Sequence, residues 1–307
     1  MSDERLLHSA EYFGDTRDFW WNRDFLELMA RRWGLTDEAP RVLDVGCGVG
    51  HWARLLLSLL PPRATLVGVD REPRWVERAR ETAERLGLGA RTTWQRGDAT
   101  RLEFPDASFD VVTCQTVLIH LARPEEALAG MVRVLRPGGL LVVAEPQNLA
   151  ATLLLGKTRF HAPIDEVLAL ARLQFICERG KEALGEGNNS VGELVPGMFR
   201  RLGLEDVQVF MSDQASPFLP PYETPAARAM KAELLDQASR DFWNWSREDT
   251  TRFFFAGGGD AAEFERLWSL ARASLRQLAA AVEAGTEERV GNGPHFLISG
   301  RRPASGS

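Results

Sequence analysis

The sequence predicts an α/β fold with a mostly parallel sheet flanked by helices, and two observations carry this prediction. Between Arg41 and Glu145, short runs of β-branched and other apolar residues alternate with longer amphipathic stretches. This alternation is typical of βαβ units, in which a helix joins two parallel strands. Turn-forming residues also fall where the helical stretches end, with Pro61-Pro62 after the first and Gly87 after the second.

Five strands and three helices are expected in this region. The expected strands are Arg41 to Val45, Thr65 to Val69, Arg91 to Gln95, Phe109 to Cys114 and Gly139 to Ala144. The helices between them are expected near His51 to Leu60, Arg74 to Leu86 and Pro124 to Val134. Pro137-Gly138-Gly139 predicts a tight turn into the fifth strand.

After Glu145 the alternation stops and the pattern becomes mostly helical. Two further strand-like runs follow, Glu205 to Met211 and His295 to Gly300, and a helix from Val191 to Leu202 leads into the first. Roughly eighty residues separate these strands, which is too many for a hairpin loop in a compact domain. We interpret the intervening segment as a helical insertion between the last two strands of one sheet.

The predicted organisation therefore has six parts. They are an N-terminal helical cap segment at 1–40 with a helix around Thr16 to Trp33, a core at 41–148, a helical insertion at 149–187, a continuation of the core at 188–211, a helical cap or lid at 212–293, and the last strand with the tail at 294–307.

Composition excludes several classes of protein. A net charge of -6 and a pI near 5.6 argue against a general electrostatic grip on nucleic acid. No apolar run approaches the roughly 20 residues that span a bilayer, and the start has no apolar signal segment, so membrane insertion and secretion are not expected. Cys47, Cys114 and Cys177 are odd in number and far apart, which argues against disulfides and a zinc site. We expect no metal and a reducing, cytoplasmic compartment.

A glycine-rich turn follows the first strand and opens the first helix. Gly46, Gly48 and Gly50 permit positive φ angles and let backbone groups approach a ligand. Twenty residues beyond Gly50 the second strand ends in Asp70, whose carboxylate can accept hydrogen bonds from ribose hydroxyls. The spacing is GxGxG, whereas the dinucleotide fingerprint GxGxxG would place its third glycine where His51 stands. An NAD-dependent oxidoreductase remains an alternative at this point.

The segments VLDVGCGVG, GVD, RGDATRLEFPDASFDVV and RVLRPGGLLVVAEP resemble the successive motifs of class I S-adenosylmethionine-dependent methyltransferases, over about Arg41 to Pro146. The resemblance implies a Rossmann-like, seven-stranded sheet of order 3-2-1-4-5-7-6 with the last strand antiparallel. It also implies S-adenosylmethionine as the cofactor and S-adenosylhomocysteine as the product.

The resemblance further assigns roles to individual residues. It implies that Asp44 and the loop of Gly46, Cys47, Gly48 and Gly50 hold the methionine end of the cofactor, that Asp70 binds the ribose, that Asp98 and the Ala99 backbone read the adenine edge, and that Gln115 lines the floor of the site. Arg71 departs from the family, which more often has an apolar or small residue there. We expect Arg71 either to stack on the adenine or to face solvent.

Methyl transfer is an in-line displacement, so the protein mainly orients the reactants and excludes water. A general base is needed only where the acceptor must lose a proton. His120 and Glu145 follow the fourth and fifth strands, where a parallel sheet binds its ligand. His120 is a candidate base or a structural histidine, and Glu145 either orients a basic acceptor or caps the strand end.

The acceptor is expected to be a small molecule. The residues after the fourth strand, Thr113 to Thr116, lack the Asn/Asp-Pro-Pro-Tyr/Phe motif of families that methylate amide or exocyclic amine nitrogens. Tyr12, Trp20, Trp21 and Asn148 are the candidate substrate-binding residues. A flat apolar acceptor or a cationic amine would suit an aromatic pocket. A third alternative is a protein that binds the cofactor without catalysis.

Overall fold

The protein is described by a computed structural model that covers residues 15–35, 39–291 and 293–304. The chain divides into two compact units. The first, which we call the sheet unit, contains Trp21–Pro146, Val191–Asp213 and the described residues from His295 onward. The second, which we call the helical unit, contains the described residues up to Trp20 together with Gln147–Ser190 and Gln214–Pro294.

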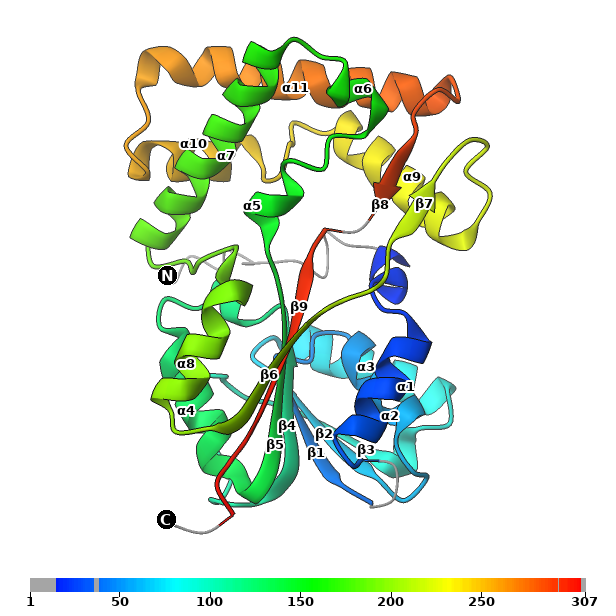
Figure 1. Cartoon of the computed structure of the whole chain (residues 1–307), viewed down its shortest axis with the longest axis vertical. Helices are drawn as coiled ribbons and strands as arrows, with labels where there is room; N and C mark the ends of the chain where they lie inside the picture. The colour runs from blue at the N-terminus through cyan, green and yellow to red at the C-terminus, as the bar shows by residue number, and fades with distance from the viewer. Residues whose placement is uncertain (1–14, 36–38, 292, 305–307) are drawn as a thin grey trace. The chain divides into compact units, whose positions relative to one another are not determined.

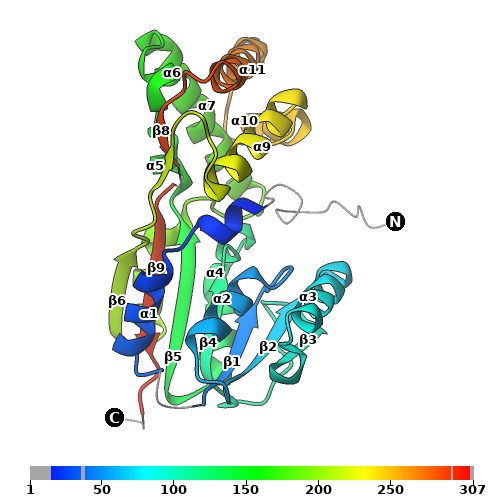
Figure 2. The same ribbon diagram turned by 90° about the vertical axis from the view of Figure 1, so that its right-hand side faces the viewer.

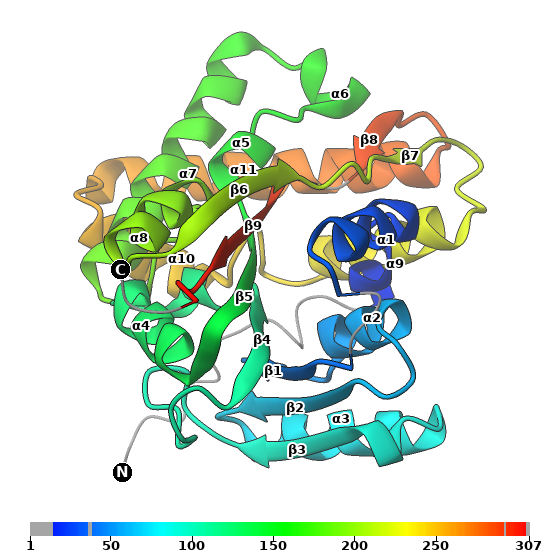
Figure 3. The same cartoon turned by 60° about the horizontal axis from the view of Figure 1, so that its bottom comes forward.

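The sheet unit is built on one seven-stranded sheet of order β3-β2-β1-β4-β5-β9-β6 (Figure 3). The strands are β1 (Arg41–Val45), β2 (Thr65–Asp70), β3 (Thr92–Arg96), β4 (Phe109–Gln115), β5 (Leu135–Pro146), β6 (Glu205–Met211) and β9 (His295–Arg301). Strand β9 is antiparallel to both of its neighbours, and the other paired strands are parallel. The predicted fold class and strand order are confirmed, with β9 as the last of the seven strands in chain order.

Helices cover both faces of this sheet (Figure 1). On one side lie α1 (Arg23–Arg32), α2 (His51–Leu59) and α3 (Pro73–Arg85), and on the other lie α4 (Pro124–Val134) and α8 (Val195–Arg201). Three short 3-10 helices complete the unit: η2 (Gly89–Arg91), η3 (Leu118–His120) and η4 (Val191–Leu194). The strands in the middle of the sheet are apolar on both faces because helices bury both of them, as Val42, Leu43 and Val45 of β1 illustrate.

Most expected elements are found within one or two residues of their predicted bounds, but the fifth strand and the N-terminal helix differ from the prediction. The predicted turn at Pro137-Gly138-Gly139 lies inside β5, which begins at Leu135. The pairing of β4 with β5 shifts register between Phe109 and Val111, so the glycines form a bulge rather than a turn before the strand. Gly138 has φ +76°, and its N–H donates to the Arg302 carbonyl at 2.8 Å.

The predicted helix from Thr16 to Trp33 is two separate pieces. Residues Asp15–Phe19 form the 3-10 helix η1 of the helical unit, and α1 belongs to the sheet unit. The break occurs because Asn22 caps α1, its side-chain oxygen accepting the Asp24 N–H at 3.1 Å. The segment predicted as one N-terminal cap is therefore divided after Trp20.

The helical unit is a set of packed helices with one small sheet (Figure 2). Its other helices are α5 (Asn148–Ala151), α6 (Gly156–Phe160), α7 (Ile164–Ala183), α9 (Pro225–Ser239), α10 (Arg247–Ala256) and α11 (Ala261–Glu283). A core of buried side chains, among them Leu173, Phe254 and Trp268, joins α7, α10 and α11. The antiparallel pair β7 (Ser216–Phe218) and β8 (Arg289–Gly291) was not predicted from the sequence. None of the described helices is long and apolar enough to cross a membrane.

Candidate active site

The glycine loop after β1 is shaped by backbone geometry that side chains would obstruct. Gly46, Gly48 and Gly50 have φ angles of +68°, +50° and +80°. A Cβ at Gly46 would collide with Val117, and a Cβ at Gly50 would lie 2.8 Å from the Trp94 ring. A Cβ at Gly48 would meet no atom within 4 Å. The first and third glycines therefore allow close packing, and the middle one faces open space where a ligand can approach.

Asp70 ties the end of β2 to this loop. Its Oδ2 accepts the N–H of Gly48 at 2.9 Å, and its Oδ1 accepts the N–H of Glu72 at 2.9 Å. Burial raises the pKa of the Asp70 carboxyl, and the two backbone N–H groups oppose this rise. Each carboxylate oxygen has a second lone pair, so both can also accept a hydrogen bond from a ligand hydroxyl.

Asp44 is a buried carboxylate, and no described residue supplies a compensating charge. Its side chain is 1% exposed, and its partners in the neighbouring strands are Gly68 and Thr113. Its Oδ2 has no hydrogen-bond partner among the described residues. Burial raises the pKa of Asp44 well above its usual range, and the Asp70 carboxylate adds to the rise. Such a group is stabilised in its charged form when a cation lies beside it.

Helix α2 begins at His51, directly after the loop. Its N-terminus is electropositive, in contrast to the negatively charged Asp44 carboxylate. Its N-cap residue is Gly50, and no side chain caps the helix. The free N–H groups of a helix N-terminus favour an anion such as a carboxylate. A carboxylate at Asp44 and an uncapped N-terminus nearby in the chain suit an amino acid, which carries an ammonium and a carboxylate group. The residues fit the methionine end of S-adenosylmethionine.

Cys47 lies within the loop and is buried. Burial raises the pKa of its thiol, and the Asp44 and Asp70 carboxylates raise it further. The thiol is therefore protonated at neutral pH and is a poor nucleophile.

The residues expected around the adenine are placed at the same edge of the sheet. Asp98 follows β3, and its Oδ1 accepts both the N–H and the hydroxyl of Thr100 at 2.8 and 2.7 Å. Ala99 is partly buried against the core, and Gln115 ends β4. The Arg71 side chain is 56% exposed, and its Nε lies 3.6 Å from a carboxylate oxygen of Glu72. Of the two positions expected for Arg71, this matches the one that faces solvent.

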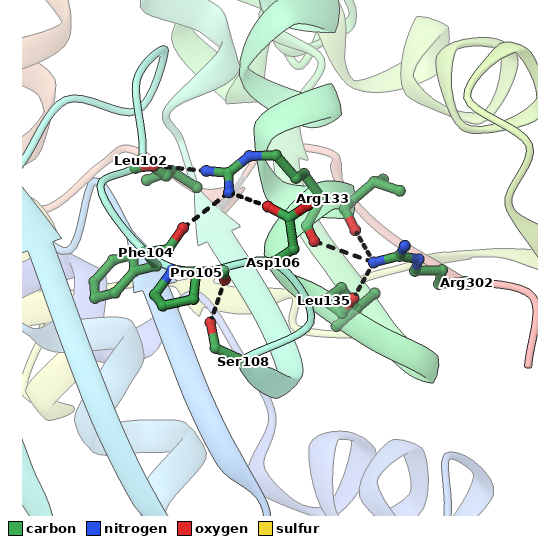
Figure 4. A network of polar contacts seen from close by, with 9 residues as sticks. Leu102, Phe104, Pro105, Asp106, Ser108, Arg133, Leu135 and Arg302 are labelled. Carbon is green, nitrogen blue, oxygen red and sulfur yellow. Dashed lines mark hydrogen bonds and ion pairs between the residues drawn. The ribbon is translucent and has the colours of Figure 1, made fainter.

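The loop from Gly97 to Ser108, which carries Asp98, is fixed by an arginine of α4 (Figure 4). The Arg133 guanidinium donates to the carbonyls of Leu102 and Phe104 at 2.7 and 2.8 Å and to Asp106 at 2.6 Å. Arg302 in turn binds carbonyls near the end of α4, including those of Arg133 and Leu135. The segment that would contact the adenine thus has a rigid anchor at its other end.

Glu145 binds the turn after β4 that leads to His120. Glu145 is fully buried, and its Oε1 accepts the N–H groups of Val117 and Leu118, both at 2.8 Å. These two residues lead into η3, whose last residue is the partly buried His120. Glu145 therefore positions the segment that carries His120, and Val117 from the same turn packs against Gly46.

Aromatic residues of the sheet unit gather near this edge, and sequence reasoning found only one of them. The Trp21 ring lies 5.4 Å from that of Trp52 and 6.3 Å from that of His295. Trp52, in the first turn of α2, donates its Nε1–H to the Thr113 hydroxyl at 2.8 Å beside Asp44. The position of Trp52 immediately after the glycine loop is the signal that could have identified it.

The other candidate substrate-binding residues fall elsewhere. Trp20 and Asn148 belong to the helical unit, where Asn148 donates to the Asn189 carbonyl at 2.6 Å. Tyr12 lies outside the described residues. Within the described parts of the chain, no group of three or more His, Cys, Asp or Glu residues could hold a metal ion.

Comparisons with known proteins agree with this geometry. The family model described as a methyltransferase domain matches residues 43–143. A solved structure, that of the YcgJ protein from Bacillus subtilis, has a TM-score of 0.51 and 20% identity, covering 92% of this chain and all of that one. At this level of identity the likeness shows the fold alone.

Two curated relatives are more similar to this chain in sequence, each over about a third of its length. Demethylmenaquinone methyltransferase of Deinococcus radiodurans is 44% identical over 111 residues, which make up 36% of this chain and 45% of that protein. Sterol 24-C-methyltransferase erg6 of Aspergillus fumigatus is 39% identical over 108 residues, 35% of this chain and 28% of that protein. The chain thus spans less than half the length of each of these two relatives.

Proposed function

We propose that the chain is a class I S-adenosylmethionine-dependent methyltransferase that transfers a methyl group from S-adenosylmethionine to a small-molecule acceptor, and the methyltransferase-domain model over residues 43–143 supports this. The single observation that best supports this is the Asp44 carboxylate, buried beside an open glycine and without a countercharge among the described residues. The α-ammonium group of the cofactor would supply that charge.

The same observation argues against the oxidoreductase alternative. Burial raises the pKa of Asp44, and repulsion from the Asp70 carboxylate raises it further. A dinucleotide would bring a pyrophosphate, with two negative charges, to a loop of this kind. The buried Asp44 carboxylate would repel the pyrophosphate, whereas it attracts a cationic group.

The chain's own residues would bind and orient the reactants. Asp70 would accept hydrogen bonds from the ribose hydroxyls, and the loop from Gly97 to Ser108 would hold the adenine through Asp98 and Ala99. When bound, S-adenosylmethionine supplies an activated methyl group on a sulfonium. Orientation and exclusion of water are then the main contributions of the protein, together worth roughly 7 to 11 kcal/mol of barrier lowering.

His120 is the group we propose to take a proton where the acceptor must lose one. Its segment is held at two backbone N–H groups by Glu145, so the imidazole has a defined position at the edge of the sheet. Glu145, with Oε1 engaged in these bonds, would act as a positioning residue.

The acceptor is proposed to be a small molecule, and the methyl group is transferred to an oxygen, nitrogen or carbon atom of it. The two relatives are named for a quinone and a sterol as methyl acceptors. Each of these two matches covers only about a third of this chain, so neither carries acceptor specificity to it. The aromatic pair Trp21 and Trp52 supports an acceptor with an apolar or cationic surface.

The test is formation of S-adenosylhomocysteine, followed by mass spectrometry, from S-adenosylmethionine and pools of quinols, amines, phenols and sterols. We expect at least one pool to give turnover, and His120→Ala to slow it and to change its pH profile if the acceptor loses a proton. A wild-type protein that binds the cofactor but turns over no pool would favour the alternative of a non-catalytic binding protein.

A further inference from the structure

The helical unit contains two arginines whose buried nitrogen atoms lack acceptors. Arg159 lies on α6, and Arg289 is the first residue of β8. The Nε and Nη2 of Arg159 and the Nε of Arg289 are buried, and no described residue accepts a hydrogen bond from them. A buried donor without an acceptor is costly, and a charged one more so. These two side chains therefore need a hydrogen-bond acceptor that no described residue supplies.

Backbone contacts bring the two segments side by side. The Lys157 N–H donates to the Glu288 carbonyl at 2.9 Å, and the Thr158 N–H donates to Glu287 Oε2 at 2.9 Å. A Cβ at Gly156 would lie 2.9 Å from the Arg289 Cβ, so only glycine fits this approach. The pair of arginines is therefore built into the fold of the unit and does not depend on flexible surface chains.

The charges at this place do not balance. Glu287 is the acid beside the arginines; Thr158 occupies its Oε2, and its Oε1 has no hydrogen-bond partner among the described residues. Neither arginine forms an ion pair with Glu287 in the part of the chain that the structure describes. Burial lowers the pKa of Arg159, and the like charge of Arg289 lowers it further. Two cations against one anion leave an excess positive charge.

We propose that Arg159 and Arg289 form a binding site for an oxyanion, the carboxylate or phosphate group of a ligand. Guanidinium groups present paired N–H donors that match both groups in bidentate geometry. A bound oxyanion would satisfy the three donors and neutralise the excess charge. The three donor atoms are buried, but both arginines are only partly buried as whole residues, so each side chain has part of its surface in solvent. This site does not depend on the proposed methyl transfer.

The test is calorimetric titration of the full-length protein with inorganic phosphate and with malonate, in a chloride buffer of matched ionic strength. We expect at least one probe to bind, and the stronger of the two identifies the source of the oxyanion. Arg159→Gln and Arg289→Gln should each weaken that binding about tenfold or more, since each removes one charged donor pair. Lys157→Gln is the matched control, because it removes a positive charge from the exposed side of the same helix. It should change binding by less than about threefold.

Thermal unfolding without either probe gives an independent reading. Arg159→Gln is expected to leave the midpoint unchanged or to raise it, because it removes a buried charge that lacks a partner. Failure of both probes to bind at about 10 mM, or equal binding by wild type and both Gln variants, would overturn the proposal. Such a result would leave the cofactor site untouched, so the two proposals fail separately.

Discussion

At the scale of single residues, Asp44 is the group on which the ligand assignment depends. Its carboxylate is buried in the middle of β1, and Oδ2 has no hydrogen-bond partner among the described residues. A folded protein retains such a group when a ligand stabilises it, since the desolvation cost opposes folding of the ligand-free chain. The Asp44 carboxylate should therefore lower the stability of the ligand-free protein and increase its affinity for the cofactor.

Asp44→Asn should separate these two effects. Because the pKa of Asp44 is raised in the folded state, the folded protein binds more protons than the unfolded chain, and stability falls as pH rises from about 4 toward the folded pKa. The variant should lose this slope in urea unfolding without ligand and be at least as stable at neutral pH. Its affinity for S-adenosylhomocysteine should fall about tenfold or more. A variant that is less stable than wild type at neutral pH and binds the ligand equally well would contradict this account.

Asp70→Ala should abolish binding of S-adenosylhomocysteine in calorimetry, with a loss of about a hundredfold or more. The substitution removes the acceptors proposed for the ribose and those for the N–H groups of Gly48 and Glu72, so the loop loses its anchor. Glu81→Ala is the control, because it removes an equal charge from an exposed position on α3. Equal affinity in both variants would exclude the role of Asp70.

At the scale of elements, Glu145 connects β5 to the turn before η3. Glu145→Ala should lower the free energy of unfolding by about 2 to 4 kcal/mol, because two buried N–H groups lose their acceptor. Glu145→Gln retains a carbonyl oxygen and should restore most of the stability and of kcat. A Gln variant that is stable but inactive would instead indicate that the carboxylate takes part in the chemistry.

Arg133 has the corresponding role for the loop from Gly97 to Ser108. Arg133→Met leaves the carbonyls of Leu102 and Phe104 without this donor, and chemical denaturation should show a loss of about 1 to 3 kcal/mol. The exposed Arg78 of α3 provides the control, and Arg78→Met should change stability by less than about 0.5 kcal/mol. Similar losses in the two variants would mean that the network in Figure 4 does not anchor the loop.

The regular elements of the sheet unit could be predicted because their signals are local. Each buried strand is an apolar run bounded by turn residues, and each helix has an amphipathic period. The strands β7 and β8 were missed because each is only three residues long, and Pro217 in β7 argues against a strand. The break between η1 and α1 depends on one capping residue, Asn22, within an otherwise helical pattern.

The sequence predicted only those site residues that lie in a recognisable sequence motif. Asp44 and the glycines lie in one contiguous motif, Asp70 follows at a set spacing at the end of the next strand, and their geometry fits the roles expected for them. Trp94 fills the space beside Gly50 and Gly68, and Trp52 binds Thr113, but both contacts join residues far apart in the sequence. The local sequence pattern does not predict such contacts, because they form only when the strands pack side by side in the folded sheet.

At the scale of the whole molecule, the sheet unit has a fixed edge from which its connections leave. The chain leaves the sheet unit after Pro146, where β5 ends, and after Asp213, just beyond β6. It returns to the sheet unit at Val191 and at His295, where the antiparallel β9 begins. The ends of β5 and β6 and the start of β9 lie at the same edge as the carboxyl end of β1, because β5 and β6 run parallel to β1 and β9 runs the opposite way.

The central claim is that the glycine loop and its two aspartates accept a cationic adenosyl amino acid rather than a dinucleotide. Calorimetric titration of the full-length protein with S-adenosylhomocysteine, and separately with NAD, tests it most directly. We predict saturable binding of S-adenosylhomocysteine in the micromolar to submillimolar range and no binding of NAD. Saturable binding of NAD together with no response to S-adenosylhomocysteine would contradict the claim.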